Sequence, residues 1–138
     1  MNENSRVLLE RLAEARRLEK AQTLFYRSLA AEAEDRGLAS ESERLNELHA
    51  DEQHHLSRLT ARVLELGGDP EDLRGGLGAV ELDGWEERAR QREDQEIDFY
   101  QTLMDEGVLD EETRAVVEEI AESERQHRRH LGGKWMSA

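Results

Sequence analysis

The chain has 138 residues, a length typical of one domain, so residues 1–138 are expected to form a single domain. It carries 33 Asp and Glu residues against 19 Lys and Arg residues, a formal net charge of −14. Nucleic acids and anionic membrane surfaces repel such a charge, and we expect neither as a partner. Cysteine is absent, which excludes disulfides, thiolate metal sites and cysteine nucleophiles. With no apolar run near the roughly 20 residues of a membrane span and no signal-peptide core, the expected location is the cytoplasm.

Helix-breaking residues divide the sequence into four helical patterns. Gly37 and Gly107 each close one pattern, and the segment 67–84 holds the only proline and most of the glycines. Ser40 with Glu43 fits a capping box at one helix start, and Asp110 fits an N-cap at another. The helices are predicted at roughly 5–36, 40–66, 82–106 and 110–131, where a Gly-Gly pair ends the last pattern.

The lengths of the connections predict an all-α four-helix bundle made of two helical hairpins. Two connections are short, so the first and second helices, and the third and fourth, should be antiparallel neighbours. The middle connection of roughly 16 residues can stretch ~50 Å, whereas a 25-residue helix is only ~38 Å long. It is therefore long enough to cross over the full length of a bundle, although a slack turn is the alternative.

Each helix carries an apolar stripe with residues three and four apart, which is typical of a bundle core. Near its middle, every stripe is interrupted by two polar residues three positions apart. The four interruptions are Glu19 and Gln22, Glu52 and His55, Glu93 and Glu96, and Glu124 and His127. Within each predicted hairpin, the polar pairs of the two helices lie at similar numbers of residues from the glycine of the turn. The two pairs should therefore lie at the same level along the hairpin to within roughly one helical turn.

The two hairpins form an internal repeat. A tyrosine follows a glutamate by seven residues in the first and third helices, as Tyr26 after Glu19 and Tyr100 after Glu93, with an offset of 74 between the halves. The Glu-x-x-His motif occurs in the second and fourth helices with an offset of 72. The chain therefore reads as two related hairpins that face one another.

Five carboxylates and two imidazoles in apolar stripes need a compensating positive charge, because a buried carboxylate without a partner is costly. No Lys or Arg occupies these positions. Two divalent cations would supply +4 against −5, and Glu-x-x-His places both ligands on one helical face. The residues that we predict as metal ligands are Glu19, Glu52, His55, Glu93, Glu96, Glu124 and His127. Oxygen and imidazole ligands suit iron or manganese, and the sequence does not choose between them.

The two tyrosines are candidate catalytic residues. A helical side chain leans toward the N-terminus, so the phenols of Tyr26 and Tyr100 can point at the metal layer and hydrogen-bond a ligand carboxylate. Simple packing is the alternative. Gln22 is expected to be a core polar residue that is hydrogen-bonded to a neighbour, and His49, His54 and His130 are expected to face solvent.

At these residues the chain resembles the ferritin-like superfamily, and within it the rubrerythrin diiron domain, over nearly its whole length. The resemblance implies Glu19, Glu52, Glu93 and Glu124 as carboxylate ligands, with Glu52 and Glu124 as bridges, and His55 and His127 as imidazole ligands. It also implies that Glu96 exchanges with His55 as the iron changes oxidation state. A full rubrerythrin has a rubredoxin-like domain with four cysteines, and cysteine is absent from these 138 residues. The position of Gln22 is usually occupied by a small residue in relatives.

This resemblance implies a cytoplasmic diiron enzyme that reduces hydrogen peroxide with electrons from an external donor, Tyr26 or Tyr100 relaying protons. Such a peroxidase need be only a homodimer. The alternative is a ferroxidase that reacts with dioxygen and sequesters iron, helped by the acidic charge. A manganese catalase-like variant and a metal-free helical scaffold also remain open, as does an exchange of hairpins between chains.

Overall fold

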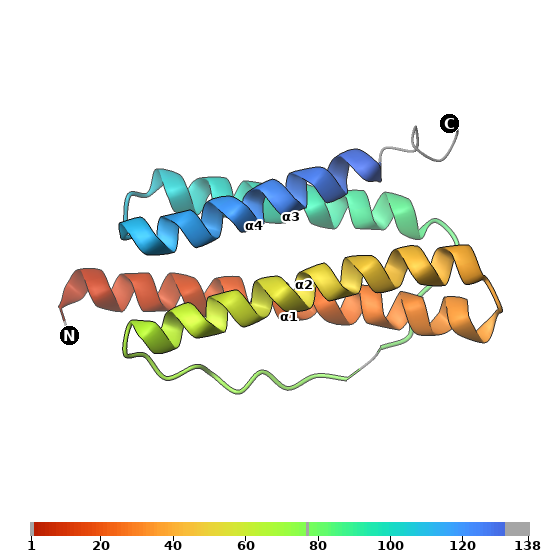
Figure 1. Ribbon diagram of the computed structural model, residues 1–138, viewed down its shortest axis with the longest axis horizontal. Helices are drawn as coiled ribbons and strands as arrows, with labels where there is room; N and C mark the ends of the chain where they lie inside the picture. The colour runs from red at the N-terminus through yellow and green to blue at the C-terminus, as the bar shows by residue number, and fades with distance from the viewer. Residues whose placement is uncertain (1, 77, 132–138) are drawn as a thin grey trace. The chain divides into compact units, whose positions relative to one another are not determined.

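The computed structural model describes residues 2–76 and 78–131. These residues form four helices and no strand: α1 (Glu3–Asp35), α2 (Ala39–Glu65), α3 (Trp85–Asp105) and α4 (Glu111–His130) (Figure 1). The predicted helices are confirmed, with ends that differ by up to three residues. Gly132 and Gly133, which we expected to end the last pattern, lie outside the described residues. No helix in the described part of the chain is long and apolar enough to cross a membrane.

By their internal contacts the residues divide into two compact units, 12–85 and 1–11 with 86–138. The first unit contains most of α1, all of α2 and the connection from α2 to α3. Its helices α1 and α2 run antiparallel, joined by a tight turn at residues 36–38 (Figure 1). The second unit contains the antiparallel hairpin of α3 and α4 together with the first turns of α1. There, Arg11 on α1 makes a two-pronged ion pair with Glu106, just beyond the end of α3, at 2.8 and 3.2 Å.

The helix ends show which local signals decide the boundaries. Asn2 caps α1, since its side-chain oxygen accepts a hydrogen bond from the Ser5 amide at 2.8 Å. Gly37 ends the same helix with a φ of +70°, a conformation that costs glycine little. Asp110 caps α4 as predicted and accepts from the Thr113 amide at 2.8 Å.

The predicted capping box of Ser40 and Glu43 is wrong. The helix α2 begins at Ala39, and its N-cap residue is Leu38, which has no side chain able to accept a hydrogen bond. The Leu38 amide still bonds the Ala33 carbonyl at the end of α1, so the turn is complete within three residues. Ser40 therefore already lies inside the first turn of α2, past the position from which it could cap.

The apolar stripes form the buried interior as expected. The apolar stripe predicted for the second helix includes Leu45, Leu48, Leu59, Val63 and Leu66, of which Leu48 and Leu66 are half-exposed. The side chains of the stripes that are buried are Leu8, Leu12, Ala15, Tyr26, Leu29, Ala33, Leu45, Leu59, Val63, Leu82, Trp85, Ala89, Tyr100, Leu103, Thr113, Val117, Ile120 and Leu131.

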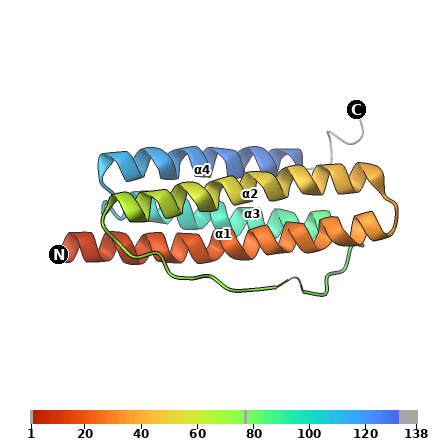
Figure 2. The same cartoon turned by 60° about the horizontal axis from the view of Figure 1, so that its bottom comes forward.

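The long connection at residues 66–84 is a crossover and not a slack turn (Figure 2). Near its start, the Glu71 carbonyl accepts a hydrogen bond from Arg16 on α1 at 3.0 Å. Further along, a Cβ at Gly75 would lie 2.9 Å from Leu24 Cδ1, so the absence of a side chain lets the connection lie close to α1. It ends at Trp85, whose indole nitrogen donates to Glu41 Oε2 at 3.0 Å, near the start of α2.

Arg16 fastens the crossover to α1 from a buried position. Its guanidinium donates to Thr60 Oγ1 at 2.9 Å as well as to the Glu71 carbonyl. Burial lowers the pKa of Arg16, and the nearby Glu71 carboxylate acts in the opposite direction. By contrast, Arg17 pairs with the Glu71 carboxylate at 3.1 Å on the exposed surface.

These two arginines allow a matched test of the crossover. We expect Arg16→Ala to lower the free energy of unfolding by about 1.5–3 kcal/mol, because buried hydrogen bonds to a charged group are lost. Arg17→Ala should change it by less than about 1 kcal/mol, because exposed ion pairs contribute little. Chemical denaturation measures both values, and limited proteolysis should cut the 66–84 segment faster in Arg16→Ala. Equal effects of the two substitutions would contradict this role of Arg16.

Candidate metal centre

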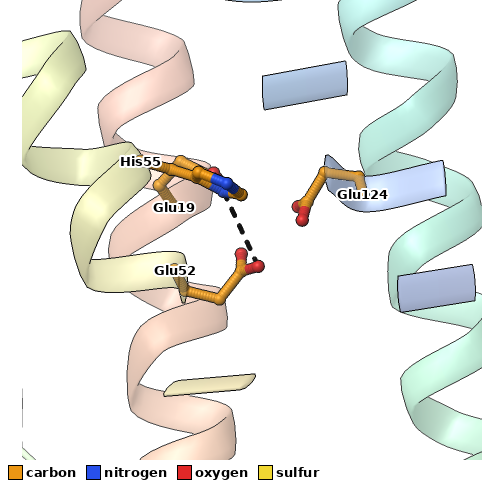
Figure 3. A group of neighbouring side chains, drawn as sticks. All are labelled: Glu19, Glu52, His55 and Glu124. Atoms are coloured by element: carbon orange, nitrogen blue, oxygen red, sulfur yellow. Dashed lines mark hydrogen bonds and ion pairs between the residues drawn. The ribbon is translucent and has the colours of Figure 1, made fainter. Parts of the chain in front are cut away.

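The α1–α2 half-site consists of Glu19, Gln22, Glu52 and His55. Glu19 and Glu52 are fully buried, and His55 is 5% exposed. One ligand atom from each of Glu19, Glu52 and His55 lies within 4.8 Å of the others. The Nδ1 atom of His55 is 2.9 Å from Glu19 Oε1 and 3.7 Å from Glu52 Oε1, so these side chains converge from two helices (Figure 3).

The α3–α4 half-site consists of Glu93, Glu96, Glu124 and His127, and it repeats this arrangement. Glu93 and Glu124 are fully buried, and His127 is 6% exposed. The ligand atoms of these three residues also lie within 4.8 Å of one another. Here Nδ1 of His127 is 3.1 Å from Glu124 Oε1 and 3.6 Å from Glu93 Oε1. Each hairpin therefore gathers two carboxylates and one imidazole in its interior.

The remaining two polar stripe residues are buried beside these groups. Gln22 lies one turn after Glu19, and Glu96 lies one turn after Glu93. Their exposed fractions are 1% and 4%. Glu96 does not belong to the described groups of carboxylates and imidazoles whose ligand atoms lie within 4.8 Å of one another. The predicted ligand Glu96 is thus enclosed in the correct hairpin, and its part in metal binding stays a prediction.

The helix lengths explain why both hairpins bring their polar pairs to one level. Glu52 and Glu124 each lie 13 residues after the first residue of their helices, Ala39 and Glu111. On the preceding helices, α1 continues for 16 residues after Glu19, whereas α3 continues for 12 after its glutamate. The difference of four residues is about one helical turn, so the same face points inward in both hairpins.

The chemistry of the donor groups fits divalent cations. Buried carboxylates at this density need positive charge, because desolvation and mutual repulsion oppose ionisation. Among the described residues, the buried Lys or Arg side chains are Arg16, which bonds Thr60 and Glu71, and Arg62, which pairs with Glu65 at 3.4 Å. Carboxylate oxygens and imidazole nitrogens are suitable ligands for iron or manganese.

Both candidate catalytic tyrosines are fully buried. Each follows a phenylalanine whose ring it contacts: the ring centroids of Phe25 and Tyr26 are 5.3 Å apart, and those of Phe99 and Tyr100 are 5.2 Å apart. These pairs extend the internal repeat to the sequences FYRSL and FYQTL, so the repeated Phe-Tyr pair is a further sequence signal for these positions. The repeat shows that each hairpin holds its tyrosine with the same aromatic neighbour.

The other three histidines differ from the site histidines in burial. His54 and His130 are exposed, as expected. His49 is half-buried, which differs from the expectation that it faces solvent. Partial burial and the positive charge of Arg27 lower the pKa of His49, which favours its neutral form.

The comparison with solved structures defines the class of fold. An X-ray structure of the bacterioferritin of Desulfovibrio desulfuricans matches with a TM-score of 0.86 and 21% sequence identity, covering 95% of this chain and 80% of that one. That bacterioferritin has a diiron site, which its structure shows in different catalytic states. The chain therefore has the ferritin-like four-helix bundle fold, as predicted.

The comparison with family models is more specific. The Rubrerythrin family model matches residues 10–133, which is most of the chain. The chain belongs to the rubrerythrin family, and the resemblance noted in the sequence is confirmed. A search of curated proteins finds no match.

A single substitution in one half-site should separate folding from metal binding. Glu52→Gln removes a buried charge with little change of shape, so the metal-free protein should be at least as stable as wild type. Stabilisation by Mn²⁺, about 2.7 kcal/mol at a concentration of 100 times the dissociation constant, should largely disappear. Thermal denaturation with Mn²⁺ and with chelator measures both effects.

The matched control is Glu47→Gln on the exposed face of the same helix. It should leave both the metal-free stability and the Mn²⁺-induced shift unchanged. Equal Mn²⁺ shifts for Glu52→Gln and wild type would contradict a metal-binding role for Glu52.

Proposed function

We propose that the two half-sites together bind two iron ions and that this chain reduces hydrogen peroxide with electrons from an external donor. The observation that carries the proposal is the repeat of a buried Glu, Glu and His set in both hairpins. Membership of the rubrerythrin family and the fold shared with a bacterioferritin that has a diiron site support it.

In this proposal each residue has a defined role toward the metal ions. Glu52 and Glu124, each from a Glu-x-x-His motif, would both hold the ions, and the resemblance to rubrerythrins implies that they would be the shared carboxylates. The remaining ligands would be Glu19, Glu93, Glu96, His55 and His127, and the resemblance implies that Glu96 would exchange with His55 as the oxidation state of the iron changes. The carboxylates bind as anions and the imidazoles as neutral ligands, so protons leave when the metal binds.

When bound, two ferrous ions supply one electron each to the peroxide O–O bond. The cleavage also consumes two protons and yields two water molecules, so the protein must deliver protons to a dry interior. We propose the phenol hydroxyls of Tyr26 and Tyr100 for this task, and the helical spacing supports it, because each tyrosine lies two turns after Glu19 or Glu93. Each hydroxyl can donate a proton toward the departing oxygen and recover one from a water molecule.

The electrons that restore the ferrous state come from another molecule in this proposal. The sequence contains no cysteine, so no thiolate-bound iron in this chain can deliver them. A small redox protein or a soluble reductant is the expected donor. This chain has a net charge of −14 and should repel an acidic protein. A donor protein should therefore carry basic groups at its contact surface.

The choice of oxidant tests the proposal directly. Under anaerobic conditions, the protein is loaded with two ferrous ions per chain and mixed with one equivalent of hydrogen peroxide, and oxidation is followed by absorbance. We expect the reaction with peroxide to be much faster than the reaction with dioxygen at the same concentration. A peroxide reaction no faster than the dioxygen reaction would favour the ferroxidase alternative.

The capacity for iron separates an enzyme from a store. A peroxidase should stop binding near two irons per chain and need be only a homodimer, whereas a storage protein retains many irons in a cage. Iron titration followed by size-exclusion chromatography gives both numbers. Metal analysis of protein isolated from its native cells distinguishes iron from manganese.

The tyrosine hydroxyls give a further prediction. Tyr26→Phe and Tyr100→Phe keep the rings that pack against Phe25 and Phe99, so the fold should be preserved. At least one substitution should slow peroxide reduction about a hundredfold, since proton transfer by a positioned group typically contributes that much or more. Stopped-flow kinetics measures the rate, and unchanged Mn²⁺ binding is the control. Full rates in the double variant would show that the tyrosines only pack.

A further inference from the structure

The internal repeat pairs Gln22 with Glu96. Both follow a predicted ligand glutamate by three residues and precede the buried tyrosine by four, and their numbers differ by the same 74 as Glu19 and Glu93. Both side chains are enclosed, with 1% and 4% of their surface exposed. The two residues have nearly the same shape, so the repeat preserves the space at this position and changes the charge.

This is the point at which the two half-sites differ in chemistry. In each half-site, one helix contributes the Glu and His of a Glu-x-x-His motif, and the preceding helix contributes a second Glu and a buried tyrosine. The α3–α4 half-site adds a third carboxylate at Glu96, whereas the α1–α2 half-site adds a neutral amide at Gln22. With neutral imidazoles, the ionised half-sites would carry three and two negative charges.

We propose that Gln22 makes the two metal positions unequal, so that the two ions bind in separate steps of different affinity. This inference rests on the proposed function for the presence of two ions. Affinity for hard divalent cations rises with the number of charged oxygen ligands. One position has a third carboxylate available, and the other faces an amide that binds a cation more weakly.

The amide also lowers the cost of the metal-free fold. A glutamate at position 22 would place a sixth carboxylate in the interior, where its desolvation and repulsion from the others oppose folding. An amide can instead donate a hydrogen bond to a carboxylate and accept another from a neighbour. Gln22 thus favours folding before metal binds, at the expense of affinity at one metal position.

Two single substitutions and their combination test this inference. Gln22→Glu gives both half-sites a third carboxylate, and Glu96→Gln gives both an amide. The double variant Gln22→Glu/Glu96→Gln exchanges the two chemistries between the half-sites. Anaerobic calorimetric titration with Mn²⁺ gives the two dissociation constants, and thermal denaturation with chelator gives the stability of the metal-free proteins.

We expect wild type to bind two Mn²⁺ ions in two steps. Each single variant should reduce the ratio of the two dissociation constants by about tenfold, Gln22→Glu by tightening the weaker step and Glu96→Gln by weakening the tighter one. The double variant should restore the ratio. The metal-free melting temperature should fall in Gln22→Glu and rise in Glu96→Gln. Gln22→Met, which keeps the charge and approximate size, should retain the two-step binding of wild type.

The outcomes separate this inference from the function on which it rests. If wild type binds no Mn²⁺, the proposed dimetal site is wrong and this inference with it. If wild type binds two ions but both single variants leave the ratio unchanged within twofold, the dimetal site stands and the role of Gln22 is wrong. If Gln22→Glu does not fold, Glu96→Gln and the Met variant still decide between these results.

Discussion

The concentration of carboxylates in the helix interiors is the constraint on which the rest of the structure depends. Glu19, Glu52, Glu93 and Glu124 have no measurable exposure, although each would gain several kcal/mol of hydration in water. Imidazole nitrogens lie within 4 Å of every one of these four carboxylates. These contacts offset part of the cost, and the bound cations of the proposed function would offset most of the remainder. The apolar residues above and below each polar layer then supply the stability that the layer itself does not.

The backbone meets this constraint through helix length more than through special local conformations. After its ligand glutamate, α1 is about one helical turn longer than α3, and the α1–α2 connection is two residues shorter than the α3–α4 connection. In both hairpins the two carboxylates and the imidazole nevertheless come together in the same way. The crossover adds a second requirement, because it must remain attached to α1 while it returns to the start of α2. Arg16 and the glycine at 75 meet that requirement with a buried hydrogen-bonded cation and a position without a side chain.

The number of helices and most of their ends were predictable from the sequence, because apolar spacing and glycines determine local backbone structure. The Asp110 cap and the end of α1 at Gly37 followed from such signals. The start of α3 did not: Gly84 has a φ of +72°, so the helix begins at Trp85, three residues later than the apolar pattern suggested. The burial of His49 was also missed, because it depends on contacts with neighbouring segments that periodicity does not report. Spacing located the ligand candidates, but only coordinates could show their imidazole–carboxylate distances.

The repeat of the two hairpins has a consequence for the origin of the chain. Two copies of the α3–α4 hairpin, related by a two-fold axis, would supply all the ligand types that the present chain draws from both of its halves. A gene encoding one such hairpin could therefore have produced a working homodimer before duplication and fusion joined the copies through the crossover. Fusion frees each copy to mutate independently, and among the polar stripe residues position 22 is the one that differs in charge from its counterpart, Glu96. A symmetric ancestor could not have made that change on one side alone.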